Sequence, residues 1–553
     1  MKTWKKLSLA GTALAAGLIL AACSGGASSK NPQLAIPTDI TTLDSGINTD
    51  TYSGIFIGNT QEGALRVDAN GDTQPALAKS VTKSKDGLTY TITLRSGLKW
   101  SNGDPITAQD FVYAWQRNDA PATGSQYAYL LASVKNAAEI NSGKIKDLSQ
   151  LGIKADSDTK LTVTLAQPTP YFNFLLSEPV YFPLDQKFVE AKGKSYGTSS
   201  ANTVYDGAFI FKGSGWTGSN ESFSLVKNPN YYDKADVKSN EIDWTVQKNP
   251  QTAVNLFKQG KLDQASLGTP QLYAANKGYN GGKDLTLLKE STTDYIEYNQ
   301  TGKGTSNPTA AKALANQDIR EALNLATDRK TIVATSTAGS TVATGFVPTG
   351  MAKTQTGQDF AAYAKQPYTY DPTKAKELWE KGLKEIGATS VSFTYESDNN
   401  SPTAKTQADF LQSSWEKTLP GLKLTEKLVP FQQRLKDSGS HNFDIVNTLW
   451  GGDYAEPSTF LGLFLPGGGE NDGGVNNAAY IKAYTAATTT PDVNNDAARN
   501  KDYKDAEAAL YDESSINPVY FRTTPALRNP KLQGLVFHGT GIEYDLKGVY
   551  LEK

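Results

Sequence analysis

Two carboxylates stand three residues apart in the stretch LWGGDYAEPSTF, at residues 449–460. Asp453 and Glu456 could form a catalytic pair, ligate a metal, start a helix or anchor a positively charged group. Glycosidases use two carboxyl groups that flank a sugar, but a spacing of three residues on a short, proline-interrupted segment suits that geometry poorly. For Glu456 a local role at a helix start is the simpler interpretation, because carboxylates are favoured there.

The rarity of cysteine and histidine excludes several kinds of chemistry. Cys23 is the only cysteine, and His441 and His538 are the only histidines. A chain body without cysteine has no disulfide and no Cys-ligated zinc or iron–sulfur site, so we expect no metal and no cofactor. A His-based catalytic triad would have to use one of these two histidines as its base. Both are expected at surface or loop positions, so such a triad is not favoured.

The stretch GSGWTG, at residues 213–218, matches a dinucleotide-binding fingerprint but fails on its context. That motif needs a following helix whose N-terminus faces the pyrophosphate. Here ESFSLVKNP follows, with the alternation of a strand. We therefore predict two strands with a Gly-rich turn between them. The chain has no Walker, HExxH or GxSxG motif either.

The N-terminus resembles that of an exported lipoprotein. A lysine-rich start precedes an uncharged run at residues 7–22, which is shorter than the roughly 20 residues of a membrane-spanning helix. The run ends in LAAC, which resembles a bacterial lipobox. We expect a signal peptide at residues 1–22, a lipid on Cys23 and a flexible tether over residues 23–30. The alternative is an ordinary signal peptide that happens to end near a cysteine.

Charge and aromatic content narrow the class of partner. The chain has 55 Lys and Arg against 57 Asp and Glu, so neither nucleic acid nor a polybasic membrane patch is favoured. The 27 tyrosines and 8 tryptophans suit a wet interior surface between lobes, because each has an apolar body and a polar tip. Core packing is an equally open use for them.

The elements that must position these residues alternate between strand-like and helix-like patterns. Residues 88–94 and 161–165 alternate apolar and polar side chains and predict half-buried strands. Residues 371–387 open on Asp-Pro and end on Gly, which predicts a helix. Thr107 and Asp110 form a capping-box pattern ahead of another helix. The predicted fold class is therefore α/β or mixed α+β.

One segment makes the chain recognisable. Residues 86–117, DGLTYTITLRSGLKWSNGDPITAQDFVYAWQR, strongly resemble a signature of the extracellular solute-binding proteins of peptide ABC importers, known as solute-binding family 5. Further segments follow in the family's order: LVKNPNYYD, LFKQGKLD, DIREALNLATDR, GFVPTG, YDPTKAKELW and WGGDYAEPSTFL. The resemblance implies a two-lobed, periplasmic-binding-protein-like (Venus-flytrap) fold with an additional domain on lobe one.

Mapped onto this sequence, the resemblance implies discontinuous units. Lobe one is expected at residues 31–61, 190–290 and 521–553. The additional domain is expected at 62–189 and lobe two at 291–520. Residues 294–300 and 517–522 are the candidate hinge strands.

The resemblance gives Asp453 the role of an anchor. In the family, the Asp three residues after the Trp pairs with the free α-amino group of the bound peptide, and Asp453 holds that position. An α-amine has a pKa of about 7.7–8.0 and is largely protonated at neutral pH. Enclosing that charge between two lobes is costly without a paired carboxylate. Asp453 is therefore expected to bind and not to catalyse.

The same resemblance predicts how the peptide main chain is held. The backbone of Leu449, Trp450 and Gly451 is expected to add to the peptide as an edge strand. The segment Thr49, Asp50 and Thr51 is expected on the peptide's other side. Wet side-chain pockets are expected to involve Trp450, Tyr127 and Tyr129, with a core role equally open for the two tyrosines.

Two features of the expected site stay open. Residues 443–449 contain no Lys or Arg, so no clamp for the ligand's carboxylate is visible near Trp450. The glycine-rich loop at residues 465–474 is a candidate gate at the entrance.

Together these features predict the extracellular substrate-binding component of an ABC importer. It would capture oligopeptides between closing lobes and deliver them to a membrane permease. We expect a monomer without enzymatic activity, held by its lipid on the outer face of the cell membrane. The alternatives are a binder of a dipeptide, an oligosaccharide or a nickel complex, a signalling-peptide receptor, and a surface glycosidase that uses Asp453 and Glu456.

Overall fold

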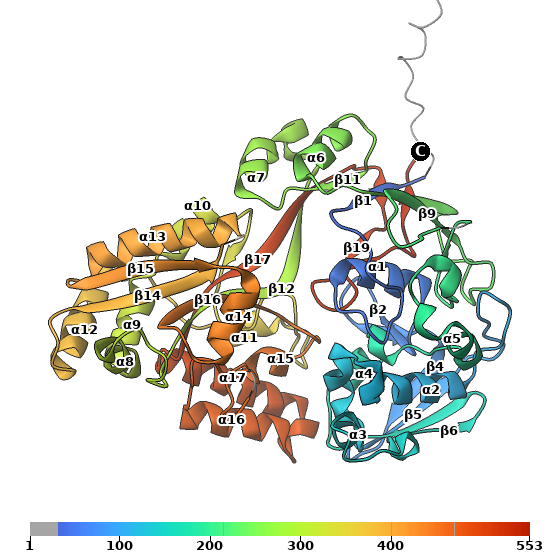
Figure 1. Cartoon of the computed structure of the whole chain (residues 1–553), viewed down its shortest axis with the longest axis horizontal. Coiled ribbons are helices and arrows are strands. Elements are labelled where there is room, and N and C mark those ends of the chain that lie inside the picture. Colours follow the sequence, from blue (N-terminus) through green and yellow to red (C-terminus); the bar gives the residue numbers. More distant parts are fainter. Residues whose placement is uncertain (1–30, 214, 400, 469) are drawn as a thin grey trace, which may run out of the picture.

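The computed structural model describes residues 31–553 except 214, 400 and 469, and it shows two bodies joined by two long strands (Figure 1). The expected signal peptide, Cys23 and tether lie outside the described residues. The long strands are β12 (Leu285–Tyr298) and β17 (Ile516–Arg528), which pair antiparallel. Both candidate hinge segments lie largely within these two strands.

The two strands belong to a seven-stranded sheet that extends into one body. The strand order is β11-β17-β12-β16-β14-β15, and the short β13 (Thr341–Val342) also pairs with β17. The other strands are β11 (Gln264–Ser266), β14 (Val391–Asp398), β15 (Leu422–Val429) and β16 (Ile445–Gly451). Their pairing is parallel from β16 through β14 to β15. The hinge strands are thus continuous with the sheet of the body that holds the predicted lobe two.

Helices cover this sheet and form two clusters of buried side chains. One cluster contains Trp379, Phe393 and Trp415, and the other contains Phe346, Phe464 and Tyr480. The helices are α8 (Pro308–Ala315), α9 (Gln317–Leu325), α10 (Arg329–Ser336), α11 (Phe360–Tyr363), α12 (Pro372–Glu385), α13 (Pro402–Thr418), α14 (Phe431–Gly439), α15 (Ser458–Leu461), α16 (Ala478–Thr488) and α17 (Asp496–Asp512). The predicted helix at 371–387 is confirmed as α12, whose N-cap is Asp371.

The other body begins with a four-stranded sheet of order β1-β10-β9-β8. Its strands are β1 (Gln33–Ile36), β10 (Glu241–Val246), β9 (Ser222–Lys227) and β8 (Phe209–Phe211), and α1 (Thr51–Thr60) packs its Phe56 among Phe223 and Trp244. The remaining elements are α6 (Pro250–Lys258), α7 (Pro270–Asn276) and the pairs β18–β21 (Leu532–Gln533, Tyr550–Leu551) and β19–β20 (Val536–Phe537, Tyr544–Asp545). The predicted strand–turn–strand unit is confirmed, because β8 and β9 pair antiparallel and flank GSGWTG.

Residues 62–189 hold a second small sheet with a core of its own. The antiparallel order is β4-β5-β7-β6, and α2 packs Phe111 and Trp115 into the same cluster as Ile92 and Leu161. The bounds are β2 (Leu65–Val67), β3 (Thr73–Pro75), β4 (Ala78–Lys83), β5 (Thr89–Leu94), β6 (Ile153–Ser157), β7 (Lys160–Thr164), α2 (Ala108–Asp119), α3 (Ala137–Asn141), α4 (Phe172–Leu175) and α5 (Gln186–Lys192). The capping box of Thr107 and Asp110 is confirmed. The exact division into lobes and additional domain stays a prediction.

Within the part of the chain that the structure describes, no helix combines the length and the apolar character needed to cross a bilayer.

Candidate ligand-binding cleft

A cavity of about 960 Å³ opens between the two bodies and collects most of the predicted site residues. Its floor is formed by the hinge strands, whose lining side chains alternate along each strand and so share one face. These are Leu288, Glu290, Thr292 and Asp294 of β12 and Tyr520, Arg522, Thr524 and Ala526 of β17; Thr523 also reaches the lining and is the exception to the alternation. The predicted residues in the lining are Thr49, Asp50, Thr51, Tyr127, Leu449, Gly451 and Asp453.

The backbone of residues 449–451 has one edge available for an added strand. β16 pairs with β12 from Ile445 to Gly451, but it pairs with β14 only at Ile445 and Val446. From Asn447 onward, therefore, no described strand pairs with its other edge. An unpaired edge is the template that strand addition uses.

Trp450 differs from the expectation. Strand alternation exposes Leu449 and Gly451, and it turns Trp450 to the opposite face, where it packs partly buried against the cluster of Phe464 and Tyr480. The side chain of Trp450 is not part of the cavity lining. Only its main chain remains available to a ligand in the predicted way.

The segment of residues 49–51 meets the cavity at the start of α1. Asp50 is the N-cap of this helix, with Thr51 as its first residue. The carboxylate of Asp50 accepts the N–H of Ser53 at 2.7 Å and the hydroxyl of Thr41 at 2.6 Å. Both carboxylate oxygens of Asp50 already accept hydrogen bonds from neighbouring residues of the same body. This segment therefore offers a ligand mainly its main chain and the side chains of its threonines.

Asp453 lies half-buried in the cavity wall. Its backbone N–H donates to the Thr459 hydroxyl at 3.0 Å. Burial raises the pKa of the Asp453 carboxyl to about 6, the charge of Glu470 adds to this rise, and hydrogen bonds from Tyr129 and Thr459 oppose it. No cationic side chain of the described residues contributes to this pKa. The carboxylate is therefore largely ionised at neutral pH and partly desolvated, without a counter-ion.

Aromatic contacts bring residues 62–189 up to Asp453. The rings of Tyr127 and Tyr129 stack with centroids 5.7 Å apart, and Tyr129 is 52% exposed. Tyr454, the neighbour of Asp453, stacks on Tyr171 at 3.8 Å with the ring planes 2° apart. Tyr129 is outside the cavity lining but hydrogen-bonds the Asp453 carboxylate. A core role is thus excluded for Tyr129, whereas Tyr127 both lines the cavity and packs against the local core.

Glu456 does not share this cavity. It is 7% exposed, and its Oε2 accepts the N–H of Ser458, the first residue of α15, at 3.0 Å. Its Oε1 lies 3.5 Å from Nε of Arg499. The interpretation of Glu456 as a helix-start residue is confirmed. Asp453 and Glu456 therefore do not converge on one space as glycosidase carboxyls must.

The cavity floor contains charged residues that the sequence reasoning missed. Arg522 is the only Lys or Arg among the described lining residues, and its Nε lies 3.2 Å from Oε2 of Glu290. Burial raises the pKa of the nearby Glu543 to about 7, and the charge of Glu290 adds to this rise. His538 lies in the loop between β19 and β20, as expected, and this loop position also lines the cavity. A signal for Arg522 was present, because it is a lone charge at the end of the apolar run of a hinge strand.

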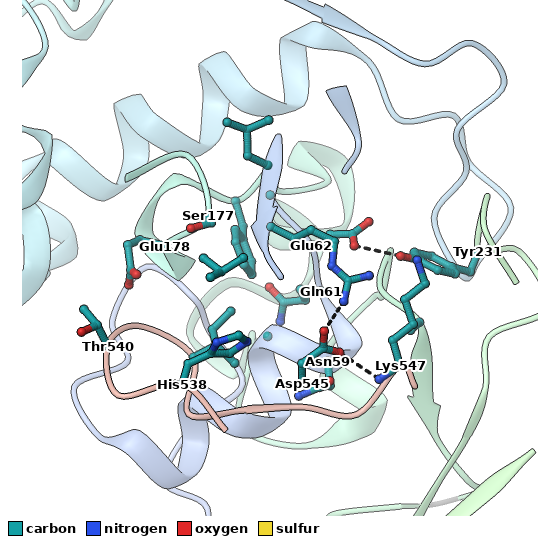
Figure 2. Close-up of a pocket in the computed structure, with 18 residues that line it drawn as sticks. Asn59, Gln61, Glu62, Ser177, Glu178, Tyr231, His538, Thr540, Asp545 and Lys547 are labelled. Atoms are coloured by element: carbon teal, nitrogen blue, oxygen red, sulfur yellow. Dashed lines mark hydrogen bonds and ion pairs between the residues drawn. The ribbon is translucent and has the colours of Figure 1, made fainter. Parts of the chain in front are cut away.

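A second cavity, of about 50 Å³, lies between lobe one and residues 62–189 (Figure 2). Its charged groups are largely paired. The Tyr231 hydroxyl donates to Glu62 at 2.8 Å, and Arg66 forms an ion pair with Asp545. Glu178 lines this cavity and the larger one. The sequence reasoning missed Glu178 as well, although an acid within the apolar run FNFLLSEPVYF is itself a signal, since a buried carboxyl is costly without a partner.

The loop at residues 465–474 is fixed to the end of β12. The N–H of Gly473 donates to Glu297 at 3.2 Å, and the N–H of Gln300 donates to the carbonyl of Gly473 at 2.8 Å. None of the loop's described residues lines the large cavity. A gating role for this loop stays an unsupported prediction.

Two bodies, a pair of connecting strands and a large cavity between them define a ligand-binding protein of the two-lobed, cleft-closing class. The chain matches the family model for bacterial extracellular solute-binding proteins, family 5, over residues 72–472, and it belongs to this family. It is 56% identical over 554 residues to the dipeptide-binding protein of Lactococcus lactis subsp. cremoris, with 100% of both chains covered.

Solved structures agree on the fold. OppA of Listeria monocytogenes, bound to peptide, is 34% identical with a TM-score of 0.74, over 95% of this chain and 99% of that chain. The unliganded open form of the periplasmic murein tripeptide-binding protein MppA is 27% identical with a TM-score of 0.78, over 95% and 98%.

Proposed function

We propose that this protein captures peptides between its two lobes and delivers them to the membrane permease of an ABC importer. The observation that carries this function is the Asp453 carboxylate, which is partly desolvated and has no counter-ion in the cavity wall. A protonated peptide amine supplies the missing charge. The dipeptide-binding and peptide-bound relatives support this class of ligand.

The peptide's main chain lies between the free edge of β16 and the start of α1. Residues 449–451 extend the sheet by strand addition, which gives affinity that depends little on the ligand's side chains. Residues 49–51 face the peptide from lobe one. A ligand that touches both lobes at once favours the closed arrangement, because those contacts exist only when the lobes are closed.

Arg522 is available for the carboxylate of a short peptide. Its Nε is engaged by Glu290, whereas an arginine carries five N–H donors. The side chain is 50% exposed at the cavity floor. Arg522→Gln should weaken a free peptide more than the same peptide with a C-terminal amide. Equal weakening of both would remove Arg522 from this role.

The proposal also covers how the protein is attached to the membrane and whether it acts as an enzyme. A lipid on Cys23, after removal of residues 1–22, holds the protein as a monomer at the outer face of the cell membrane. The protein binds and releases its ligand without breaking a covalent bond. The separation of Asp453 from Glu456 supports this, because the paired-carboxyl alternative requires them to converge.

The test is mass spectrometry of the small molecules released when the purified protein is denatured, together with calorimetry of peptide binding. We expect released peptides, and binding of a free-amine peptide that Asp453→Ala weakens strongly. The matched control is Asp472→Asn, which removes another half-buried carboxyl whose pKa burial raises to about 6, outside the cavity lining. Release of sugars alone, or unchanged binding by Asp453→Ala, would contradict the proposed ligand.

A further inference from the structure

Glu178 is a buried carboxyl group that the anchor described above does not use. It is 9% exposed, it lines both cavities, and its Oε1 has no hydrogen-bond partner. Figure 2 shows Glu178 beside Thr540 at one end of the small cavity, and no dashed line reaches it. It is the N-cap residue of a 3-10 turn, Pro179–Tyr181, yet its side chain makes no capping bond. Since buried polar groups are nearly always paired, Glu178 needs an explanation.

Glu178 and Asp453 both line the large cavity. Burial and then the charge of Asp453 raise the pKa of Glu178 to about 8. The charges of both carboxyls also act on Tyr127 and on Tyr129. Of the two carboxyls, Asp453 is hydrogen-bonded by Tyr129. Asp453 comes from lobe two and Glu178 from residues 62–189, so the two carboxyls approach the ligand space from opposite sides of the cleft.

The remaining surroundings of Glu178 offer it no cation. A Cβ added to Gly541 would come within 2.6 Å of Oε1, so that side is closed by backbone. In the small cavity, Arg66 is paired with Asp545 and Lys547 is paired with Asp233.

Two other titratable groups of the small cavity, His538 and Glu62, supply no positive charge to Glu178 either. Burial lowers the pKa of His538, which keeps its ring neutral at pH 7. Glu62 is itself an acid and is already bonded by Tyr231. The large cavity is thus the space next to Glu178 in which a ligand could supply the missing cation.

We propose that Glu178 is a second carboxyl of the ammonium site, and that the ligand's ammonium group is held between Asp453 on lobe two and Glu178 on the opposite side. This rests on the proposed function. An ammonium group carries three N–H donors, enough for both carboxyls and one further acceptor. The α-amine and a basic first side chain offer the same chemistry, so either is a possible source of the ammonium.

The experiment measures the affinity for trialanine and for N-acetyl-trialanine by calorimetry. Hydrogen bonds to charged groups contribute about 1.5–3 kcal/mol, so Glu178→Gln should weaken trialanine about 10- to 150-fold. N-acetyl-trialanine should bind weakly and equally to the wild type and the variant. The matched control is Glu62→Gln, which removes a buried glutamate of the same small cavity outside the large one and should change affinity less than about twofold.

A double-mutant cycle joins the two carboxyls. If one ammonium contacts both, then Asp453→Asn and Glu178→Gln together cost less than the sum of their separate effects. Should Glu178→Gln fail to fold, as judged by its melting temperature, Glu178→Asp carries the test. This variant keeps the carboxylate but shortens the side chain by one methylene. Its loss of affinity for trialanine should lie between that of the wild type and that expected for Glu178→Gln.

The outcomes separate this inference from the proposed function. If Asp453→Asn weakens trialanine and Glu178→Gln does not, Glu178 is not part of the site. If Glu178→Gln weakens the acetylated peptide equally, it acts on structure and the inference fails. If the wild type binds no peptide at all, the proposed function fails first. N-acetyl-Lys-Ala-Ala separates the sources, because its binding depends on Glu178 only if the site accepts a side-chain ammonium.

Discussion

The affinity for free-amine peptides should pass through a maximum near neutral pH, because two groups must be charged at once. The Asp453 carboxyl has a pKa of about 6 in the empty cleft, and burial beside an ammonium lowers that pKa in the complex. Peptide binding below pH 6 must therefore expel a proton from Asp453. Affinity rises with pH from 5 to 7 and falls above about pH 8, where the α-amine loses its charge.

The magnitude follows from these pKa values and from the cost of an unpaired charge. At pH 5 about one tenth of the Asp453 carboxyls are ionised, so affinity should lie about tenfold below its value at pH 7. Removing the Asp453 carboxylate should lower the affinity more than protonating it at pH 5 does. The loss of one partner of a desolvated pair costs about 2–5 kcal/mol, so Asp453→Asn should lower the affinity about 30- to 4,000-fold.

Calorimetry of trialanine binding from pH 5 to pH 9 checks this reasoning. Asp453→Asn should abolish the rise on the acid side, and Asp472→Asn should keep it, although Asp472 titrates in the same range. If Glu178 also ionises on binding, the rise continues toward pH 8 in the wild type and levels off near pH 7 in Glu178→Gln. Equal affinity at pH 5 and pH 7 in the wild type would refute the assignment of Asp453 as the charged anchor.

Further predictions concern packing, stability and attachment. In Gly452→Ala the new Cβ would come within 2.9 Å of a methionine sulfur and 3.0 Å of a phenylalanine ring. Overpacking of this kind costs about 1–3 kcal/mol, so both the melting temperature and the peptide affinity should fall. In the control Gly439→Ala the new Cβ meets nothing within 4 Å, so neither quantity should change. Burial raises the pKa of Glu507 to about 7, so the folded state holds a proton that the unfolded state releases above its ordinary pKa. Stability should therefore decrease as pH rises from about 5 to 7, and Glu507→Gln should flatten the melting temperature over that range; an unchanged slope would contradict this. Cys23→Ser should release the protein from membranes into the medium, as cell fractionation and immunoblotting would show, and a variant that stays membrane-bound would remove the lipid from the proposal.

Local pattern was sufficient for elements whose signals are complete within a few residues. The helix α12 carries Asp371 as N-cap and Pro372 behind it, and the structure begins the helix at Pro372. Glu456 followed the same logic, because a carboxylate near a helix start satisfies local N–H groups. Neither case depends on distant parts of the chain.

Residues that act across the cleft could not be predicted from local pattern. The unpaired edge of residues 449–451 exists because β14 leaves β16 after Val446, which depends on how three strands diverge. Trp450 was assigned to a pocket from its place in a motif, but strand alternation turns it to the other face. Arg522 comes from β17, and only folding brings it to the site.

Opposed carboxyls would also couple the charge of the ligand to the closure of the lobes. Like charges repel each other more strongly in a partly desolvated cleft than in water, so closing the lobes with Asp453 and Glu178 both ionised would be unfavourable. The empty protein limits this cost because Glu178, with its pKa of about 8, keeps its proton at neutral pH. An ammonium group between the two carboxyls favours the ionised form of Glu178 and is attracted to both carboxylates. Ligand charge and lobe closure are thereby coupled, and a peptide without a free amine should be both a weaker ligand and a poorer inducer of closure.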